Sequence, residues 1–132
     1  MEEIKEPAND QFKASPDSKT LVDLVIEGMK KRKATDITVM DVSDLTTLTD
    51  YFIICSGNSD TQIKAIADSV EEEVLEATKE KAWKKEGLQG RTWIILDFIN
   101  IVVHVMSKEK REFYSIERIW NDARVTYIEN ED

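Results

Sequence analysis

The chain has 132 residues, of which 41% are hydrophobic and 34% are charged, and its formal net charge is -9 at pH 7. This length is enough for one domain with a buried core, and the composition is that of a globular protein rather than a disordered one. The acidity disfavours general binding to phosphate backbones, which requires lysine and arginine, and favours a basic protein partner.

The single cysteine, Cys55, cannot form an internal disulfide, so cysteine usage gives no support to secretion. Its position inside an apolar run predicts a small buried side chain rather than a nucleophile. The acidic N-terminus resembles neither a signal peptide nor a typical transit peptide, and no stretch approaches the ~20 apolar residues that span a bilayer. We therefore expect a cytoplasmic protein without membrane contact.

The first part of the chain predicts a flexible acidic tail over residues 1–15 and then a helix. Ser15-Pro16-Asp17 is typical of a helix start, and apolar residues recur at helical spacing as far as Met29. The basic cluster at 30–33 favours the solvated last turn of that helix over a nucleic-acid contact.

Two strands and a helix follow. Residues 36–42 alternate as a strand that is covered on both faces, and 51–55 form a continuous apolar run, which predicts a central strand. Helical spacing returns after Ser59, with Asp60 in the first turn and the apolar series continuing to Ala77.

The remaining elements are a hairpin and a last helix. Trp83 is placed on a short edge strand, and 91–97 and 101–106 are predicted to pair as a hairpin. The last helix is expected over 109–123, and 126–132 are expected to form an acidic C-terminal tail. The side chains spaced for burial on the last helix are Phe113, Ile116, Ile119 and Trp120.

This order of elements predicts an α/β fold with a mixed, mostly five-stranded sheet and flanking helices. The folded domain is expected over residues 16–125, between the two tails.

The loop after the central strand, Ser56-Gly57-Asn58-Ser59, is where a phosphate could bind a helix N-terminus. The Walker and dinucleotide-binding glycine patterns are both absent. A nucleotidyltransferase-like enzyme that uses the Gly57–Ser59 loop is the alternative reading, but it requires two aspartates one residue apart on a neighbouring strand. Asp41 and Asp44 are three apart, so on a strand they would point to opposite faces.

His104, the single histidine, lies among aliphatic residues on a predicted strand. An acid-base pair with Asp97 across the hairpin can be imagined, but a hydrogen-bonded structural histidine is favoured. No ligand spacing for a metal is present, so we expect no catalytic site, no metal and no cofactor.

Residue types that anchor protein interfaces occur on the hairpin and the last helix. They are Trp93, Arg111, Tyr114 and Trp120. The apolar stripe of the last helix assigns Trp120 to the core. Composition alone leaves Trp93 and Tyr114 open between core and interface.

The sequence resembles the ribosomal silencing factors, also called the Iojap family. The stretches that carry the resemblance run in family order from about Leu21 to Ala123, and no single one is diagnostic by itself. They are TDYFIICSGNS, IKAIADSVEEEV, WIILDF, IVVHVM and REFYSIERIW.

The resemblance implies a nucleotidyltransferase-like fold without catalysis. It implies binding to the large ribosomal subunit through its protein numbered fourteen, which blocks subunit association and represses translation under nutrient limitation. The contact residues it implies are Trp93 and Tyr114, with Arg111, Glu117 and the hairpin turn on the same surface. It also implies a homodimer, and no direct sequence-specific contact with nucleic acid.

The hairpin turn departs from the family pattern, Asp-Tyr-Gly-Asp, because residues 97–100 read Asp-Phe-Ile-Asn. A β-branched residue does not easily take a positive φ, so we expect Asn100 rather than Ile99 to be the left-handed residue of the turn.

Overall fold

The computed structural model describes residues 17–130, which form a six-stranded mixed sheet in the order β3-β4-β5-β2-β1-β6. Strands β2 and β5 are parallel, and every other neighbouring pair is antiparallel. The strands are β1 (Thr35–Asp41), β2 (Tyr51–Gly57), β3 (Lys84–Glu86), β4 (Trp93–Asp97), β5 (Ile101–Ser107) and β6 (Arg124–Tyr127). The mixed α/β class is confirmed with one strand more than expected, while the likeness to nucleotidyltransferases stays a prediction.

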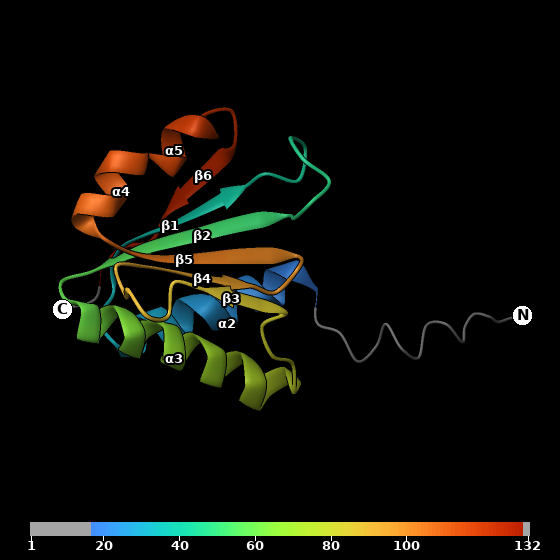
Figure 1. Ribbon diagram of the computed structural model, residues 1–132. Coiled ribbons are helices and arrows are strands. Elements are labelled where there is room, and N and C mark those ends of the chain that lie inside the picture. Colours follow the sequence, from blue (N-terminus) through green and yellow to red (C-terminus); the bar gives the residue numbers. More distant parts are fainter. Residues whose placement is uncertain (1–16, 131–132) are drawn as a thin grey trace, which may run out of the picture.

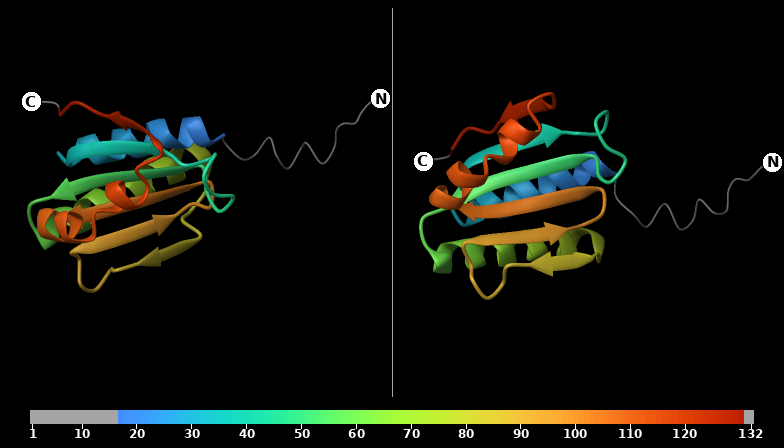
Figure 2. Two further views of the ribbon diagram at one scale, coloured as in Figure 1. Left: turned by 90° about the horizontal axis from the view of Figure 1, so that it is seen from above. Right: turned by 45° about the horizontal axis from the view of Figure 1, so that its top comes forward.

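Helices cover the two faces of the sheet unequally (Figures 1 and 2). The long helices α2 (Ser18–Lys31) and α3 (Asp60–Thr78) pack side by side on one face. The short helices α4 (Lys108–Tyr114) and α5 (Ile116–Ile119) lie on the other face. The second face is therefore the one with sheet surface left over.

The period-2 alternation of the strands sends side chains into two cores. On β2, Ile53 and Cys55 belong to the main core under α2 and α3, whereas Ile54 belongs to a smaller core under α4 and α5. Because both faces of β2 are covered, its sequence is a continuous apolar run. The prediction that it is a central strand is confirmed, since it lies between β5 and β1.

The two long helices approach closely where both carry small residues. A Cβ on Gly28 would lie 2.7 Å from the Cα of Val70, and the Ser69 hydroxyl donates a hydrogen bond of 2.8 Å to the Gly28 carbonyl. The N-cap of α2 is Asp17, whose carboxylate accepts from the Thr20 amide at 2.8 Å. The predicted contribution of Ser15 and Pro16 to this helix start lies outside the described residues.

The hairpin and its edge strand form as the alternation predicts, with β4 paired to β5 and the short β3 at the sheet edge. Trp83 itself precedes β3, and its amide donates to the Asp97 carbonyl at 2.7 Å. The turn of the hairpin differs from the prediction, because Ile99 has φ +77° and Asn100 does not have a positive φ.

The last helix is broken in two, which the sequence pattern did not predict. Ser115 has left-handed backbone angles (φ 47°, ψ 56°) and separates α4 from α5. Because the break rotates α4 relative to α5, the predicted buried stripe is wrong in part. Ile116 is buried and Trp120 packs against the smaller core, but Phe113 and Ile119 are 79% and 69% exposed.

Residues 124–128 have more structure than the acidic tail expected over 126–132, of which 131–132 lie outside the described residues. Residues 124–127 form β6, which pairs antiparallel with β1, and the Ile128 amide donates to the Ile37 carbonyl. Val125 of this strand is half-buried and packs against the smaller core. The charged residues around it led to the prediction of a tail. The expected N-terminal tail lies outside the described residues.

Candidate functional site

The loop between β2 and α3 is closed by hydrogen bonds from its own chain. Ser59 is the N-cap of α3, and its hydroxyl accepts from the Gln62 amide at 3.0 Å. The Gln62 side chain reaches back and accepts from the Asn58 amide at 2.6 Å, so the pair forms a capping box one residue wider than usual. Two of the amides that could hold a phosphate are thus already paired.

The same glutamine ties the loop to the end of α2. Its side-chain amide donates to the carbonyls of Arg32 and Lys33 at 3.1 and 3.2 Å. These carbonyls lie at a helix C-terminus, where partners are otherwise supplied by water. The loop therefore has a structural role as the joint between α2 and α3.

The candidate catalytic groups are not brought together. Cys55 is fully buried, and burial raises the pKa of its thiol to about 12, which keeps it protonated and unreactive. Asp97 pairs with Val102 across the hairpin, while His104 pairs with Ile95. Within residues 17–130, no group of three His, Cys, Asp or Glu side chains is arranged to hold a metal ion.

His104 is instead a hydrogen-bonded histidine on the sheet, as favoured from the sequence. It is 8% exposed, and its Nδ1 accepts a hydrogen bond of 3.0 Å from the Trp93 indole Nε1. Burial lowers the pKa of His104 to about 4, against a smaller opposing effect of the Glu117 carboxylate. The ring is therefore neutral at pH 7, as an Nδ1 acceptor requires.

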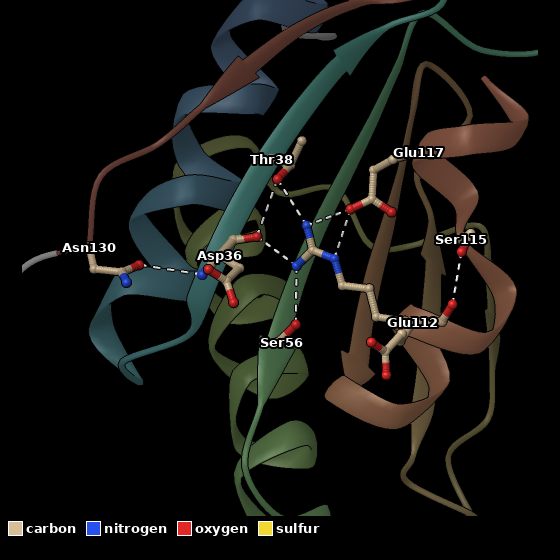
Figure 3. Close-up of polar contacts among 8 residues, drawn as sticks. Asp36, Thr38, Ser56, Glu112, Ser115, Glu117 and Asn130 are labelled. Carbon is tan, nitrogen blue, oxygen red and sulfur yellow. Dashed lines mark hydrogen bonds and ion pairs between the residues drawn. The ribbon is translucent and has the colours of Figure 1, made fainter. Parts of the chain in front are cut away.

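Arg111 of α4 points inward, with a side chain 13% exposed, and fastens its helix to the sheet. Figure 3 labels its partners Thr38, Ser56 and Glu117. Its guanidinium donates to the Ser56 hydroxyl of β2 at 3.1 Å, and to the Asp36 carbonyl and Thr38 hydroxyl of β1 at 2.6 and 2.9 Å. It also pairs with the Glu117 carboxylate of α5 at 2.8 Å. We call Arg111, Glu117 and these sheet partners the arginine clasp.

The clasp spans the break at Ser115, because Arg111 precedes the break and Glu117 follows it. The Arg111 side chain is 13% exposed, and all three of its nitrogens donate hydrogen bonds within this chain. The guanidinium is thus committed to holding α4 and α5 in place and has little left to offer a partner.

Three aromatic rings meet on the surface beside the clasp. The Trp93 and Tyr114 ring centroids are 4.8 Å apart, and Tyr114 and Phe113 pack edge to face at 5.0 Å. Tyr114 is 42% exposed, Phe113 is largely exposed, and Trp93 is half-buried. We call Trp93, Phe113 and Tyr114 the aromatic patch. The Lys110 ammonium lies 5.8 Å from the Tyr114 ring centroid, within reach of a cation–π interaction.

Of the residues expected to contact a partner, Trp93 and Tyr114 lie together at the surface, and Arg111 and Glu117 lie beside them in the clasp, with side chains 13% and 33% exposed. The hairpin turn is at the opposite end of β4 from Trp93, about 14 Å away at the usual rise of a strand. Phe113 was missed as a surface residue because helical spacing assigned it to the buried stripe. Nothing in the spacing of a continuous helix places Phe113 at the surface. Its exposure follows from the break at Ser115, which the sequence pattern does not predict.

Comparison with known proteins assigns the family. The model described as ribosomal silencing factor during starvation matches residues 15–132. The chain belongs to this family. A relative in Bacillus subtilis, named ribosomal silencing factor RsfS, is 33% identical over 105 residues, which cover 80% of this chain and 88% of the relative.

Two further proteins are similar to this chain. A mouse protein named mitochondrial assembly of ribosomal large subunit protein 1 is 31% identical over 101 residues, covering 75% of this chain and 44% of that protein. A crystal structure of a protein from Chromobacterium violaceum superposes with a TM-score of 0.78 at 31% identity, covering 87% of this chain and 95% of that one. No helix within residues 17–130 is long and apolar enough to span a membrane.

Proposed function

We propose that this protein silences translation by binding the large ribosomal subunit and blocking its association with the small subunit. It acts in the cytoplasm under nutrient limitation, as a binding protein rather than an enzyme. Family membership supports the silencing role, and the names of the bacterial and mouse relatives support a connection with the ribosome and its large subunit. The partner proposed is the large-subunit protein numbered fourteen.

The observation that carries the proposal is the aromatic patch. A single exposed aromatic side chain is common on a protein surface, but a cluster of them packed together is typical of the centre of a protein interface. Tyr114 and Phe113 remain exposed, while the Tyr114 ring packs on both Trp93 and Phe113. Arg111 and Glu117, which the family resemblance places on the same surface, hold α4 in place through the clasp.

Charge fits the same kind of partner. The net charge of -9 favours a basic protein surface over the ribosomal RNA backbone. Binding to such a surface is expected to weaken moderately as salt screens the attraction, without the steep loss that many phosphate contacts would cause.

The protein is also proposed to form a homodimer, as the family resemblance implies. Sedimentation velocity at micromolar concentration should then give a species of twice the mass of the 15.2 kDa chain. A monomer at every concentration tested would remove the dimer from the account without affecting ribosome binding.

The test of the function uses purified subunits. The protein should sediment with large subunits and not with small ones, and should lower the yield of joined ribosomes when both subunits are mixed. Undiminished subunit joining at saturating protein would refute the proposal. Stabilisation by ATP with Mg²⁺ in a melting experiment would instead favour a nucleotidyltransferase-like enzyme, because a ligand that binds only the native state raises its stability.

A further inference from the structure

His104 lies behind the aromatic patch at a position where a titratable side chain is not needed for packing. It sits on β5 opposite Ile95 of β4, with aliphatic residues on either side in sequence, and is 8% exposed. A purely structural position of this kind is normally filled by an apolar residue, because burying a polar group has a cost unless it is hydrogen-bonded. The hydrogen bond that His104 makes is therefore informative.

That bond is made to an aromatic residue of the proposed interface. The Trp93 indole Nε1 donates to His104 Nδ1 at 3.0 Å, and the two ring centroids are 5.9 Å apart. An indole has one donor and no acceptor, so this bond uses the only polar atom of the Trp93 side chain. It fixes both the position and the rotation of the indole ring.

His104 also connects the patch to the core. A row of rings runs from Trp120 to Phe52 at 5.2 Å and from Phe52 to His104 at 5.6 Å, both edge to face. The row continues from His104 through Trp93 to Tyr114. Phe52 and Trp120 pack against the smaller core, so the imidazole is the link between the fixed rings and the exposed ones.

We propose that His104 is a positioning residue for ribosome binding, which holds the Trp93 indole against Tyr114 in the orientation that the partner meets. This inference rests on the proposed function, since it assigns a role within the same surface. It differs from a purely structural role because the effect of His104 on binding passes through the indole N–H of Trp93. Pre-arranged aromatic rings bind better because their rotation is not lost on association.

The test is a double-mutant cycle between His104→Leu and Trp93→Phe, with affinity for the large subunit as the readout. Leucine removes the acceptor and keeps an apolar side chain, and phenylalanine keeps a ring and removes the N–H. His104→Leu should weaken binding about fivefold in the wild-type background, the value of one hydrogen bond, and should have no effect in the Trp93→Phe background. His104→Asn, whose carbonyl oxygen lies near the position of Nδ1, should retain binding within about twofold.

A measurement on the free protein supports the cycle. The indole N–H signal of Trp93 in a ¹⁵N spectrum is identified by its loss in Trp93→Phe, and it should exchange with water faster in His104→Leu than in wild type. Equal weakening by His104→Leu in both backgrounds would contradict the positioning role, as would unchanged binding in the wild-type background. Failure of the wild-type protein to bind large subunits would instead contradict the proposed function.

Discussion

At the scale of single residues, the turn between β4 and β5 is the clearest departure from what the sequence predicts. Ile99 has φ +77°, and the Asn100 amide donates to the Phe98 carbonyl at 2.9 Å, which is the hydrogen bond of a γ-turn. The Asp97 carboxylate holds the turn by accepting from the Ile99 amide at 2.7 Å. Local propensity disfavours a positive φ at a β-branched residue. The pairing of β4 with β5 and the hydrogen bond to Asp97 nevertheless hold Ile99 in this conformation.

The strain at Ile99 gives a stability prediction. Ile99→Gly should raise the free energy of unfolding by about 1 kcal/mol, because glycine takes a positive φ without steric cost and the Ile99 side chain is more than half exposed. Denaturant unfolding measures the change. Asn100→Gly is the matched control and should give no gain, since Asn100 lacks a positive φ; equal effects of the two substitutions would argue against strain at Ile99.

His104 gives a prediction of pH dependence. Its folded-state pKa is lowered from 6.5 to about 4, so the unfolded chain binds a proton that the folded chain does not as the pH falls through this interval. Stability is therefore full above pH 6.5 and falls toward pH 4, by as much as about 3 kcal/mol. His104→Leu should show a shallower loss over the same interval. Parallel stability curves for the two proteins would mean that His104 is not held neutral by burial.

At the scale of elements, the long helices and the first five strands follow from local periodicity. The short elements α4, α5 and β6 do not. The break between α4 and α5 at Ser115 depends on the arginine clasp, whose contacts join Arg111 to residues more than fifty positions away in β1 and β2. Similarly, β6 is defined by its pairing with β1 rather than by its own four residues. Contacts of this range cannot be read from the spacing of apolar residues.

Removal of the clasp should loosen the two short helices. Arg111→Ala leaves Glu117, Thr38 and Ser56 without their shared partner, and should cost about 2–3 kcal/mol of stability, less than for a fully buried pair because Glu117 is 33% exposed at its side chain. Hydrogen exchange should quicken in 108–119 more than in the sheet. Arg118→Ala, at an exposed position of α5, is the control and should change neither quantity appreciably. Uniform loss of protection over the whole sheet would contradict a local role for the clasp.

The loop before α3 gives the second prediction at this scale. Ser59→Ala should cost about 1 kcal/mol, because it removes the side-chain cap of a long helix, and should leave ribosome binding intact. Thr61→Ala is the control and should be nearly neutral, because Thr61 is exposed in the first turn of α3 and is not the N-cap. Saturable nucleotide binding that Ser59→Ala abolishes would overturn the structural assignment of this loop.

At the scale of the whole molecule, the unequal covering of the sheet explains where a binding surface can form. Helices α2 and α3 close one face with the main core, whereas α4 and α5 cover part of the other. Trp93, which packs against the smaller core, stays half-buried. The sequence predicted the class of the sheet. The family resemblance named Trp93 and Tyr114, whose rings lie 4.8 Å apart in the structure, and their contact with a partner stays a prediction. The sequence did not predict Phe113 as their exposed neighbour or the inward direction of Arg111, because both depend on how α4 is fastened.

The measurement that tests the account most directly is the affinity of Tyr114→Ala for the large ribosomal subunit, compared with Tyr127→Ala. Both tyrosines are exposed, but Tyr127 lies on the edge strand β6, where it lines a pocket with Arg111 of the clasp and is outside the aromatic patch. Tyr114→Ala should lose about 2 kcal/mol of binding free energy, roughly thirtyfold in affinity, with a melting temperature close to that of wild type. Tyr127→Ala should bind as wild type does. Wild-type affinity in a folded Tyr114→Ala protein would contradict the proposal that the aromatic patch meets the ribosome.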